Sequence, residues 1–154
     1  MKSYTIYTDG SCLKNPGGPG GFACIIIDDS TNQIIANKAL GEYTTTNNRM
    51  ELEAAILGLK YFKTKSKITL ITDSTYVRSG FEKGWVEKWK KNNWKNSLKQ
   101  DVKNRDLWED LLSLVETHDV KFIWVRGHDT NKYNNMVDAM ARDKAIEISL
   151  TKRY

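Results

Sequence analysis

Two short stretches of the chain each end in an aspartate, a residue type that can bind a metal or move a proton. The stretch at 4–11 alternates apolar and polar residues as a half-buried β-strand does, and it delivers Asp9 just before small residues take over. The stretch at 68–74 repeats this arrangement around Asp73. Because ligands gather at the carboxyl ends of strands in α/β sheets, we expect these two carboxylates to surround one site. The alternative is that each Asp merely starts a turn.

Two further acids fall on predicted helices. Cap-forming residues at 44–48 precede a helical apolar pattern at 50–59, and Glu51 lies on the side of that helix expected to face the sheet. An acid there can also be explained by the helix dipole. Asp138 borders the apolar face of a helix that follows a polar loop predicted over 127–135. A carboxylate at such a boundary is costly unless it is paired or bound to a cation.

The two histidines of the chain differ in their setting. His128 follows a strand end and a glycine inside the polar loop, so it is a candidate functional residue. His118 lies at the end of a predicted helix, where the dipole favours a cation, and it is expected to be structural.

The remaining pattern predicts one α/β domain. Strands are expected at 4–11, 22–27, 33–42, 68–73 and 120–125, the first three as an antiparallel meander, and helices at 50–59, 74–83, 106–117 and from about 137. Gly18 to Ala23 match the dinucleotide pattern G-x-G-x-x-G/A, but a strand pattern follows where a phosphate-binding helix would be needed. No dinucleotide site is therefore predicted.

Positive charge is concentrated in one segment. The chain has a net charge of +5, and residues 83–105 contain eight basic residues against two acidic ones. The same segment holds three tryptophans, of which Trp85 and Trp89 are spaced about one helical turn apart. Lysines that bind phosphate and indoles that stack on sugar or base suit a nucleic-acid strand. Trp85 and Trp89 could instead hold a short helix against the core.

Composition restricts the class of protein further. With 40% hydrophobic and 28% charged residues, the chain has the balance of an ordinary globular domain, and no apolar run approaches the ~18 residues of a membrane span. The start of the chain leads straight into the first strand without a signal-peptide pattern, so we expect a cytoplasmic location. Cys12 and Cys24 lack disulfide or zinc spacing and are expected to be free thiols.

Taken together, these residues resemble the type 1 ribonuclease H family. The matching pieces follow the family's order over nearly the whole chain: Thr8–Cys12, Asn15–Gly17, Thr46–Leu52, Thr72–Ser74, Tyr76–Val77, the basic tryptophan-rich insertion, Val102–Asn104, and Gly127–His128 ten residues before Asp138. The resemblance implies a ribonuclease H-like fold, that is, a five-stranded mixed sheet flanked by helices, in a single domain over residues 1–154. Its basic insertion spans about 83–105.

The resemblance also implies an activity. The enzyme would be an endonuclease that cleaves the RNA strand of RNA–DNA hybrids by two-metal-ion catalysis and leaves 5′-phosphate and 3′-hydroxyl ends. Two Mg²⁺ ions, or Mn²⁺ in their place, would be held by Asp9, Glu51, Asp73 and Asp138, with Asp9 bridging. His128 would assist proton transfer or product release. The hybrid would be the partner, no membrane would be involved, and the protein would be a monomer.

The resemblance assigns further residues to the substrate. Asn15, Asn47 and Asn48 would touch the minor groove of the hybrid, and Thr46 with Asn104 would seat a DNA phosphate. The basic insertion would add Trp85, Trp89, Lys90 and Lys91. The chain departs from the family pattern by an extra glycine within residues 15–21 and at Thr44, Thr75, Asn131 and Asn135. None of these departures removes an expected metal ligand.

Two other readings compete with this one. A binding module could keep the fold and basic face without catalysis. The loss of any of the four acids would favour that hypothesis, but all four are present. A DNA nuclease of the integrase or resolvase type would share the carboxylate chemistry. The basic tryptophan-rich insertion and the cluster at 46–48 favour a reader of hybrids.

Overall fold

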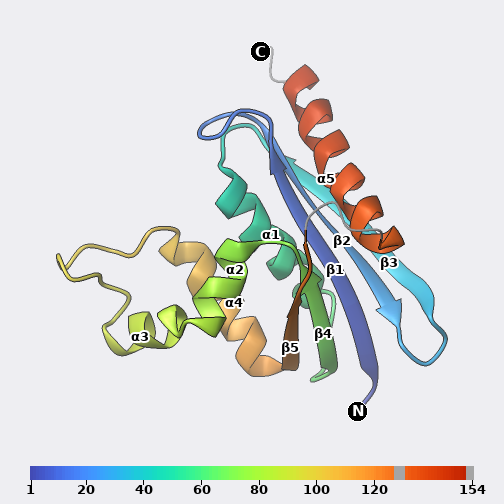
Figure 1. The fold of residues 1–154 in the computed structure, drawn as a ribbon, viewed down its shortest axis with the longest axis horizontal. Helices are drawn as coiled ribbons and strands as arrows, with labels where there is room; N and C mark the ends of the chain where they lie inside the picture. The colour runs from blue at the N-terminus through green and yellow to red at the C-terminus, as the bar shows by residue number, and fades with distance from the viewer. Residues whose placement is uncertain (127–130, 152–154) are drawn as a thin grey trace.

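The computed structural model describes residues 1–126 and 131–151, and its centre is a five-stranded mixed sheet (Figure 1). The strands, in chain order, are β1 (Ser3–Cys12), β2 (Gly20–Asp28), β3 (Gln33–Glu42), β4 (Lys67–Thr72) and β5 (Asp119–Trp124). Their order across the sheet is β3-β2-β1-β4-β5. The first three form an antiparallel meander, whereas β4 runs parallel to β1 and β5 parallel to β4. The predicted mixed sheet is confirmed.

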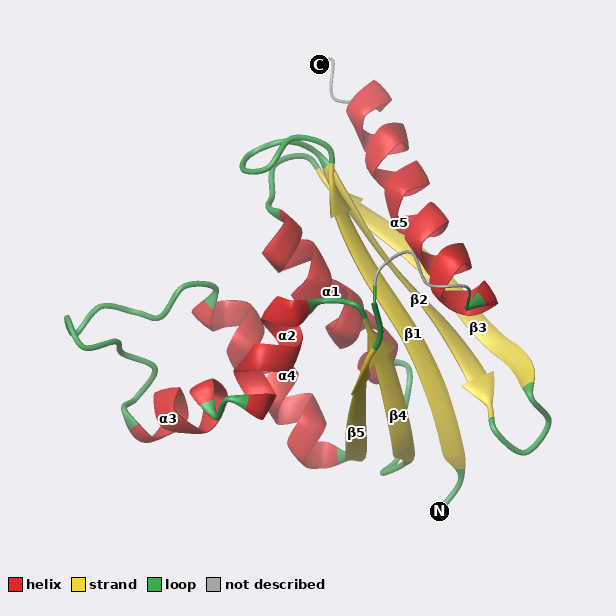
Figure 2. Cartoon of the chain, viewed as in Figure 1, coloured by secondary structure: helices red, strands yellow, loops and turns green. Residues whose placement is uncertain are grey.

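The helices cover both faces of this sheet. They are α1 (Asn47–Lys60), α2 (Thr75–Glu82), α3 (Trp85–Lys91), α4 (Arg105–Thr117) and α5 (Lys132–Thr151). Figure 2 shows α5 lying along the β1–β3 part of the sheet. Helix α1 packs on β1 and β2 and also contacts α4, whereas α2 and α4 contact β5. The short helix α3 and the loop after it project away from the sheet (Figure 2).

Side-chain alternation along the strands builds a core on each face. Ile6 of β1 packs with the apolar residues of α1, α2 and α4, whereas its neighbour Tyr7 packs with Val137 and Ala141 of α5. The strand β2 is buried along almost its whole length because helices cover both of its faces. It begins at Gly20, so the glycine-rich match leads into a strand, as expected. Within the described residues, no helix has the length and apolar character needed to cross a membrane.

Helix α5 begins earlier than the sequence pattern suggested. The loop predicted over 127–135 is wrong for 132–135, which form the first turn of this helix. Asn131 explains the difference, because its side-chain oxygen accepts hydrogen bonds from the backbone N–H groups of Tyr133, at 2.9 Å, and Asn134, at 3.0 Å. A polar stretch can therefore be a capped helix start rather than a loop.

His118 is structural, although not as a dipole partner. It is buried at the end of α4, and its Nδ1 accepts a hydrogen bond from the Ser66 N–H at 3.1 Å. Burial lowers the pKa of this imidazole. A neutral acceptor, rather than the expected cation, is what this contact requires.

Candidate active site

The site is built on Asp9, near the end of the central strand β1. Its side chain is only 6% exposed, and one of its carboxylate oxygens accepts a hydrogen bond from the Gly10 N–H at 2.9 Å. Parallel pairing brings β4 alongside β1, so the residue after β4, Asp73, reaches the same edge of the sheet. This is the arrangement that the two repeated strand ends predicted.

Glu51 enters the cluster from α1. Thr46 begins this helix by accepting a hydrogen bond from the Arg49 N–H at 3.2 Å, which satisfies a donor of the first turn. Glu51 then lies over β1, where its carboxylate accepts a hydrogen bond from the Gly10 N–H. A β-carbon on Gly10 would overlap the backbone of Met50 and Glu51. The glycine therefore permits the close approach of helix and strand.

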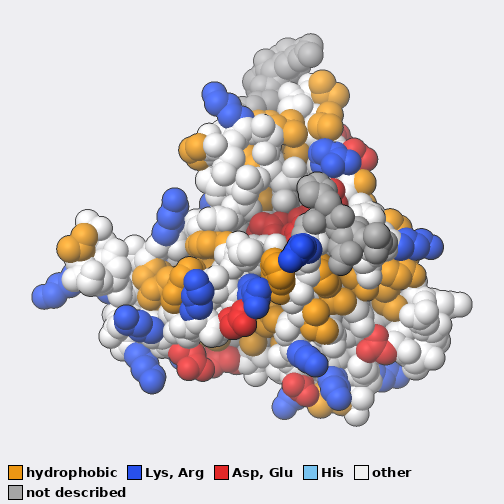
Figure 3. Space-filling model, in the orientation of Figure 1, with side chains coloured by type: hydrophobic (Ala, Val, Ile, Leu, Met, Phe, Trp, Pro, Cys, Tyr) orange, Lys and Arg blue, Asp and Glu red, His pale blue; other side chains and the backbone are white. Residues whose placement is uncertain are grey.

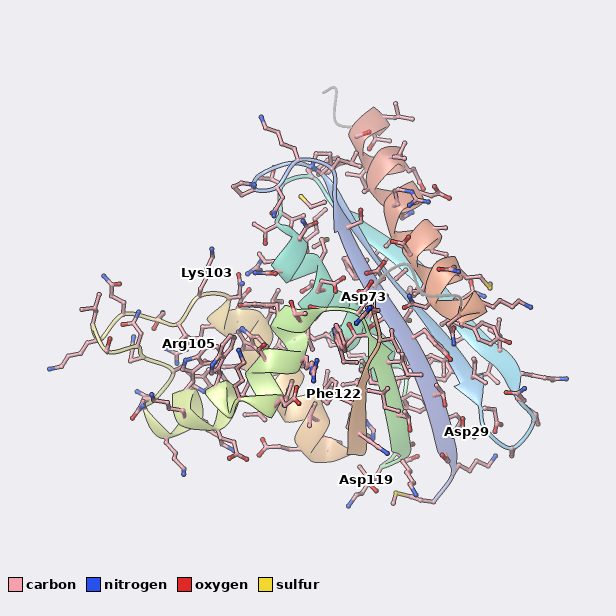
Figure 4. The ribbon with its side chains drawn as sticks, viewed as in Figure 1. Asp29, Asp73, Lys103, Arg105, Asp119 and Phe122 are labelled. Carbon is pink, nitrogen blue, oxygen red and sulfur yellow. The ribbon has the colours of Figure 1, made fainter. Side chains whose placement is uncertain are left out.

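Neighbouring side chains hold the backbone around Asp73. The Trp124 indole donates a hydrogen bond to the Asp73 carbonyl at 3.2 Å, and the Ser74 N–H donates to the Thr72 hydroxyl at 3.0 Å. Ser74 also caps α2 by accepting from the Val77 N–H at 3.2 Å. Figure 4 shows Asp73 where β4 ends and α2 begins.

These three acids form one cluster. Asp9, Glu51 and Asp73 each offer a carboxylate oxygen, and these oxygens lie within 4.8 Å of one another. Burial, followed by the charge of Glu51, raises the pKa of Asp9 far above its ordinary value. Burial also raises the pKa of Glu51, and the charge of Asp73 adds to this. Groups that must lose water and repel one another are typical of a functional site rather than of a stable core.

Asp138 borders the same cluster from α5. It lines, with the three acids, a cavity of about 380 Å³, and its side chain contributes to raising the Asp9 pKa through a hydrogen bond. Arg142, one turn further along the helix, lies 3.5 Å from it in a partly exposed ion pair. The structure thus brings all four predicted acids to one cavity, with Asp138 at its side. His128 lies outside the described residues.

Asparagine side chains surround the cavity on the α1 side. The Asn47 side-chain oxygen accepts from the Cys12 N–H at 2.9 Å, and the Asn15 side-chain oxygen accepts from the Asn47 N–H at 3.1 Å. Asn48 lines the cavity beside Asn47. Because backbone N–H groups can only donate, these two contacts identify which side-chain atom of Asn15 and of Asn47 is the oxygen.

Asn104 lies further along the same side, directly before α4. Its side-chain oxygen accepts from Arg49 at 3.3 Å, and its side-chain nitrogen donates to the Tyr76 hydroxyl at 3.0 Å. Arg49 also forms a two-pronged ion pair with Asp106, at 3.0 and 2.8 Å. Asn104 and Thr46 are therefore joined through Arg49, which contacts both.

The basic tryptophan-rich segment divides into a buried and an exposed part. Trp94 is nearly buried, and the ring of Trp89 meets the core ring of Trp108 edge-on at 5.6 Å. Trp85 is half-buried and lines an open cavity together with lysines at 88, 95 and 99. Trp89 is also half-buried and lines the same cavity, and its ring lies 5.9 Å from that of Trp85. The structural alternative, in which the tryptophans hold a short helix against the core, therefore applies in part to Trp89, which packs against the core as well.

Several of the positive charges in this segment are paired. Lys90 lies 2.9 Å from Glu116, Lys95 lies 2.5 Å from Asp101, and Arg105 also pairs with Asp101 at 2.7 Å. Lys91 is exposed at the end of α3. Figure 3 shows Lys and Arg side chains spread over this part of the surface, with acidic side chains gathered in the middle of the face. Because these side chains are paired, less positive charge is available to a nucleic acid than the number of basic residues in the segment suggests.

Comparison with known proteins identifies the family. The RNase H family model matches residues 1–146 of the chain. The chain belongs to the ribonuclease H family. A ribonuclease H from Caldicellulosiruptor saccharolyticus is 48% identical over 148 residues, which covers 96% of this chain and 99% of that protein. Proteins of this name are endoribonucleases, so this ribonuclease H is an enzyme, and the general activity of the family is cleavage of the RNA strand of hybrids.

Solved structures show the same ribonuclease H fold. LC9-RNase H1, described as a type 1 RNase H with the type 2 active-site motif, is 29% identical, with a TM-score of 0.84 over 96% of this chain and 74% of that one. LC11-RNase H1, solved in complex with an RNA/DNA hybrid, is 18% identical, with a TM-score of 0.70 over 94% of this chain and 97% of that one. The second likeness shows the shared fold alone.

Tyr76 and Asn134 had no predicted role, although both line the cavity. Tyr76 lines the cavity from the first turn of α2, and Asn134 lines it from α5, where it is buried. The signal for Asn134 is its position four residues before Asp138, which puts both on one face of the helix. The signal for Tyr76 is its place in the helix that starts directly after Asp73.

Proposed function

We propose that this protein hydrolyses the RNA strand of RNA–DNA hybrids by two-metal-ion catalysis, with Mg²⁺ as its ion, and leaves 5′-phosphate and 3′-hydroxyl ends. The observation that carries this proposal is the cluster of Asp9, Glu51 and Asp73, with Asp138 beside it, in one open cavity. Family membership supports the reaction class.

The residues present fit a hard divalent cation. Three carboxylates from β1, α1 and the end of β4 converge within 4.8 Å, and Mg²⁺ prefers such oxygen ligands. Burial raises the pKa values of Asp9 and Glu51, so a positive charge at this point would offset an unfavourable arrangement. Asp138 is the fourth proposed ligand. Its ion pair with Arg142 is exposed, and exposed ion pairs contribute little stability, so this carboxylate could exchange Arg142 for a metal ion at little cost.

When bound, the ions would activate water and neutralise charge on the phosphate. The chain's own residues set the geometry around this chemistry. Gly10 fixes the Asp9 and Glu51 carboxylates with its backbone N–H, and Trp124 fixes the Asp73 backbone. His128 remains the proposed group for proton transfer or product release.

The asparagines beside the cavity would read the hybrid. The side-chain oxygens of Asn15 and Asn47 accept from backbone N–H groups, so their amide N–H groups would be the atoms that contact a substrate. A minor groove that displays 2′-hydroxyl groups and base edges offers such acceptors. Asn48, beside them, would contribute in the same way. Their position next to the acids would place the RNA strand in the cavity.

The basic segment would hold the DNA strand. Trp85, partly exposed among lysines, is a stacking surface, and Lys91 is placed to contact phosphate. Trp89 and Lys90 would support this surface, while Thr46 and Asn104 would seat a DNA phosphate nearer the cavity. All of these residues come from one chain, so we propose that the monomer is active.

Incubation with end-labelled RNA–DNA hybrid, duplex RNA and duplex DNA, each with Mg²⁺ or EDTA, tests this function. We expect cleavage of the RNA strand of the hybrid alone, only with Mg²⁺, and products that a ligase can rejoin. Comparable cutting of duplex DNA would favour a nuclease of the integrase type. Hybrid binding without cleavage of any substrate would show a binding module.

A further inference from the structure

The hydroxyl group of Tyr76 accepts hydrogen bonds from two side-chain nitrogen atoms, which can only donate. The residue lies in the first turn of α2, is half-buried, and lines the cavity that contains the four acids. Its ring lies 5.2 Å from that of Trp108, a fully buried residue of α4. Tyr76 therefore spans the distance between the core and the cavity.

Two donors meet at this hydroxyl. The Trp108 indole N–H donates to it at 2.9 Å, and the Asn104 side-chain nitrogen donates to it at 3.0 Å. An indole nitrogen can only donate, so the direction of the first bond is fixed. The Tyr76 hydroxyl thus connects a rigid core residue with Asn104.

The orientation of the Asn104 amide is fixed from its other end. Its oxygen accepts a hydrogen bond from the guanidinium of Arg49 at 3.3 Å, and a guanidinium can only donate. The nitrogen must then face Tyr76, since oxygen and nitrogen occupy opposite corners of the amide. Arg49 is itself held by its two-pronged contact with Asp106.

The Asn104 backbone shows that the side chain is diverted from its usual role. Asn104 occupies the cap position of α4 with φ of 61°, in the left-handed region, and its side chain makes no capping hydrogen bond. Asparagine at this position ordinarily caps the helix with its side chain. Here the side chain is committed to Arg49 and Tyr76 instead. Asparagine tolerates the left-handed backbone conformation better than most residues do.

Counting donors shows what remains for a ligand. Tyr76 accepts two hydrogen bonds, which uses both of its acceptor positions, so its own O–H proton must go to a third group. One N–H of Asn104 is used by Tyr76, and the second is left over. The Tyr76 O–H and the second Asn104 N–H are therefore neighbouring donors. Such donors beside a basic segment suit a phosphate oxygen.

We propose that the Tyr76 hydroxyl is a positioning group: supported by Trp108, it holds the Asn104 amide so that its second N–H binds a backbone phosphate of the DNA strand. This inference rests on the proposed function, because it takes the hybrid as the ligand. The competing explanation is that the Tyr76 hydroxyl only satisfies the buried indole N–H of Trp108.

A double-mutant cycle separates the two explanations. Tyr76→Phe, Asn104→Ala, the double variant and the control Tyr61→Phe, an exposed tyrosine at the far end of α1, are compared for binding of fluorescent hybrid in EDTA. We expect each single substitution at 76 or 104 to weaken binding about fivefold or more, as for a bond to a charged group. The double variant should then lie within about twofold of Asn104→Ala, since one bond cannot be lost twice.

Kinetics with Mg²⁺ add a second readout. Tyr76→Phe should raise KM by a similar factor and leave kcat within about threefold, because a phosphate contact outside the cluster binds ground and transition states alike. Independent, multiplicative effects of the two substitutions, or unchanged hybrid affinity in Tyr76→Phe, would overturn the inference. Affinity that survives in Asn104→Ala would overturn it as well.

Two features of the experiments separate failure of this inference from failure of the proposed function. Binding in EDTA does not depend on cleavage, so a parent that binds hybrid but never cuts it would overturn the proposed function and not this inference. If Tyr76→Phe does not fold, the side-chain amide signal of Asn104 in the ¹⁵N NMR spectrum of the parent still tests the contact of Asn104 with the hybrid, on which the inference depends. The signal should shift when hybrid is added, and an unmoved signal would contradict the inference.

Discussion

The Gly10 N–H of β1 donates a hydrogen bond to the Glu51 carboxylate of α1 and thereby joins the central strand to the helix beside it. The same N–H contacts the Asp9 carboxylate at 2.9 Å. One backbone group therefore sets the relative positions of two acids from distant parts of the chain. The contact depends on a residue without a side chain, because a β-carbon there would overlap Met50 and Glu51.

Gly10→Ala tests this dependence. The added methyl group must push α1 away from β1, so we expect unfolding to become easier by about 1–3 kcal/mol, as for other overpacked sites. Displacement of Glu51 by about 1 Å should reduce turnover by as much as ~10²-fold. Thermal unfolding and hybrid cleavage would be measured together. Parent-like turnover in a folded variant would show that the close approach is not needed.

Asp9→Asn should make the metal-free protein more stable while it abolishes activity. Burial raises the pKa of Asp9, so the folded state keeps a proton that the unfolded state loses. The free energy of unfolding contributed by this group therefore falls as pH rises above the ordinary value of 3.8. Removing the group should raise the unfolding midpoint in EDTA at neutral pH by about 2–4 °C, or ~1 kcal/mol. An equal or lower midpoint would contradict the burial cost.

Metal binding should release protons from the cluster. The raised pKa values of Asp9 and Glu51 mean that the metal-free site holds protons in a range where ordinary carboxylates have lost them. Burial raises the pKa of Glu51 to about 7. Since ligands must be ionised, apparent Mg²⁺ affinity should rise as pH increases through this value. Titration calorimetry in two buffers of different ionisation enthalpy measures the release, and Glu51→Gln should release fewer protons. Identical heats in both buffers would argue against protonated ligands.

Much of the site was predictable because strand ends and helix faces follow local rules. Asp9 and Asp73 each end an apolar strand, and parallel pairing of two such strands brings the acids to one edge. Glu51 and Asp138 could be assigned to faces of their helices from periodicity alone. These positions depend only on patterns within about ten residues.

The rest depends on contacts between distant segments, which no local pattern contains. Asn131 looks like a loop residue until its side chain is seen to cap α5. His118 looks like a dipole partner, although the Ser66 N–H, 52 positions away, makes it a neutral acceptor. The ion pair of Lys90 with Glu116 likewise joins two helices and removes a charge that a simple count would include.

That pairing predicts different roles for two adjacent lysines. Lys91→Ala should flatten the dependence of log affinity on log salt by about 0.9, the value for one phosphate contact to duplex DNA. Lys90→Ala should change the slope less, because its ammonium group already lies 2.9 Å from Glu116. Hybrid affinity in EDTA at several salt concentrations gives both slopes. Equal changes in the two variants would show that the ion pair opens when the hybrid binds.

The central claim is that the carboxylate cluster is the metal-dependent catalytic centre. Asp73→Asn removes one charge from the cluster and keeps side-chain size, while Asp119→Asn makes the same change at the opposite end of the parallel strands (Figure 4). Turnover of RNA–DNA hybrid at saturating Mg²⁺ is the decisive measurement. We predict a loss of at least ~10²-fold for Asp73→Asn, with hybrid binding in EDTA retained, and parent-like turnover for Asp119→Asn. Turnover of Asp73→Asn within about threefold of the parent would contradict the account.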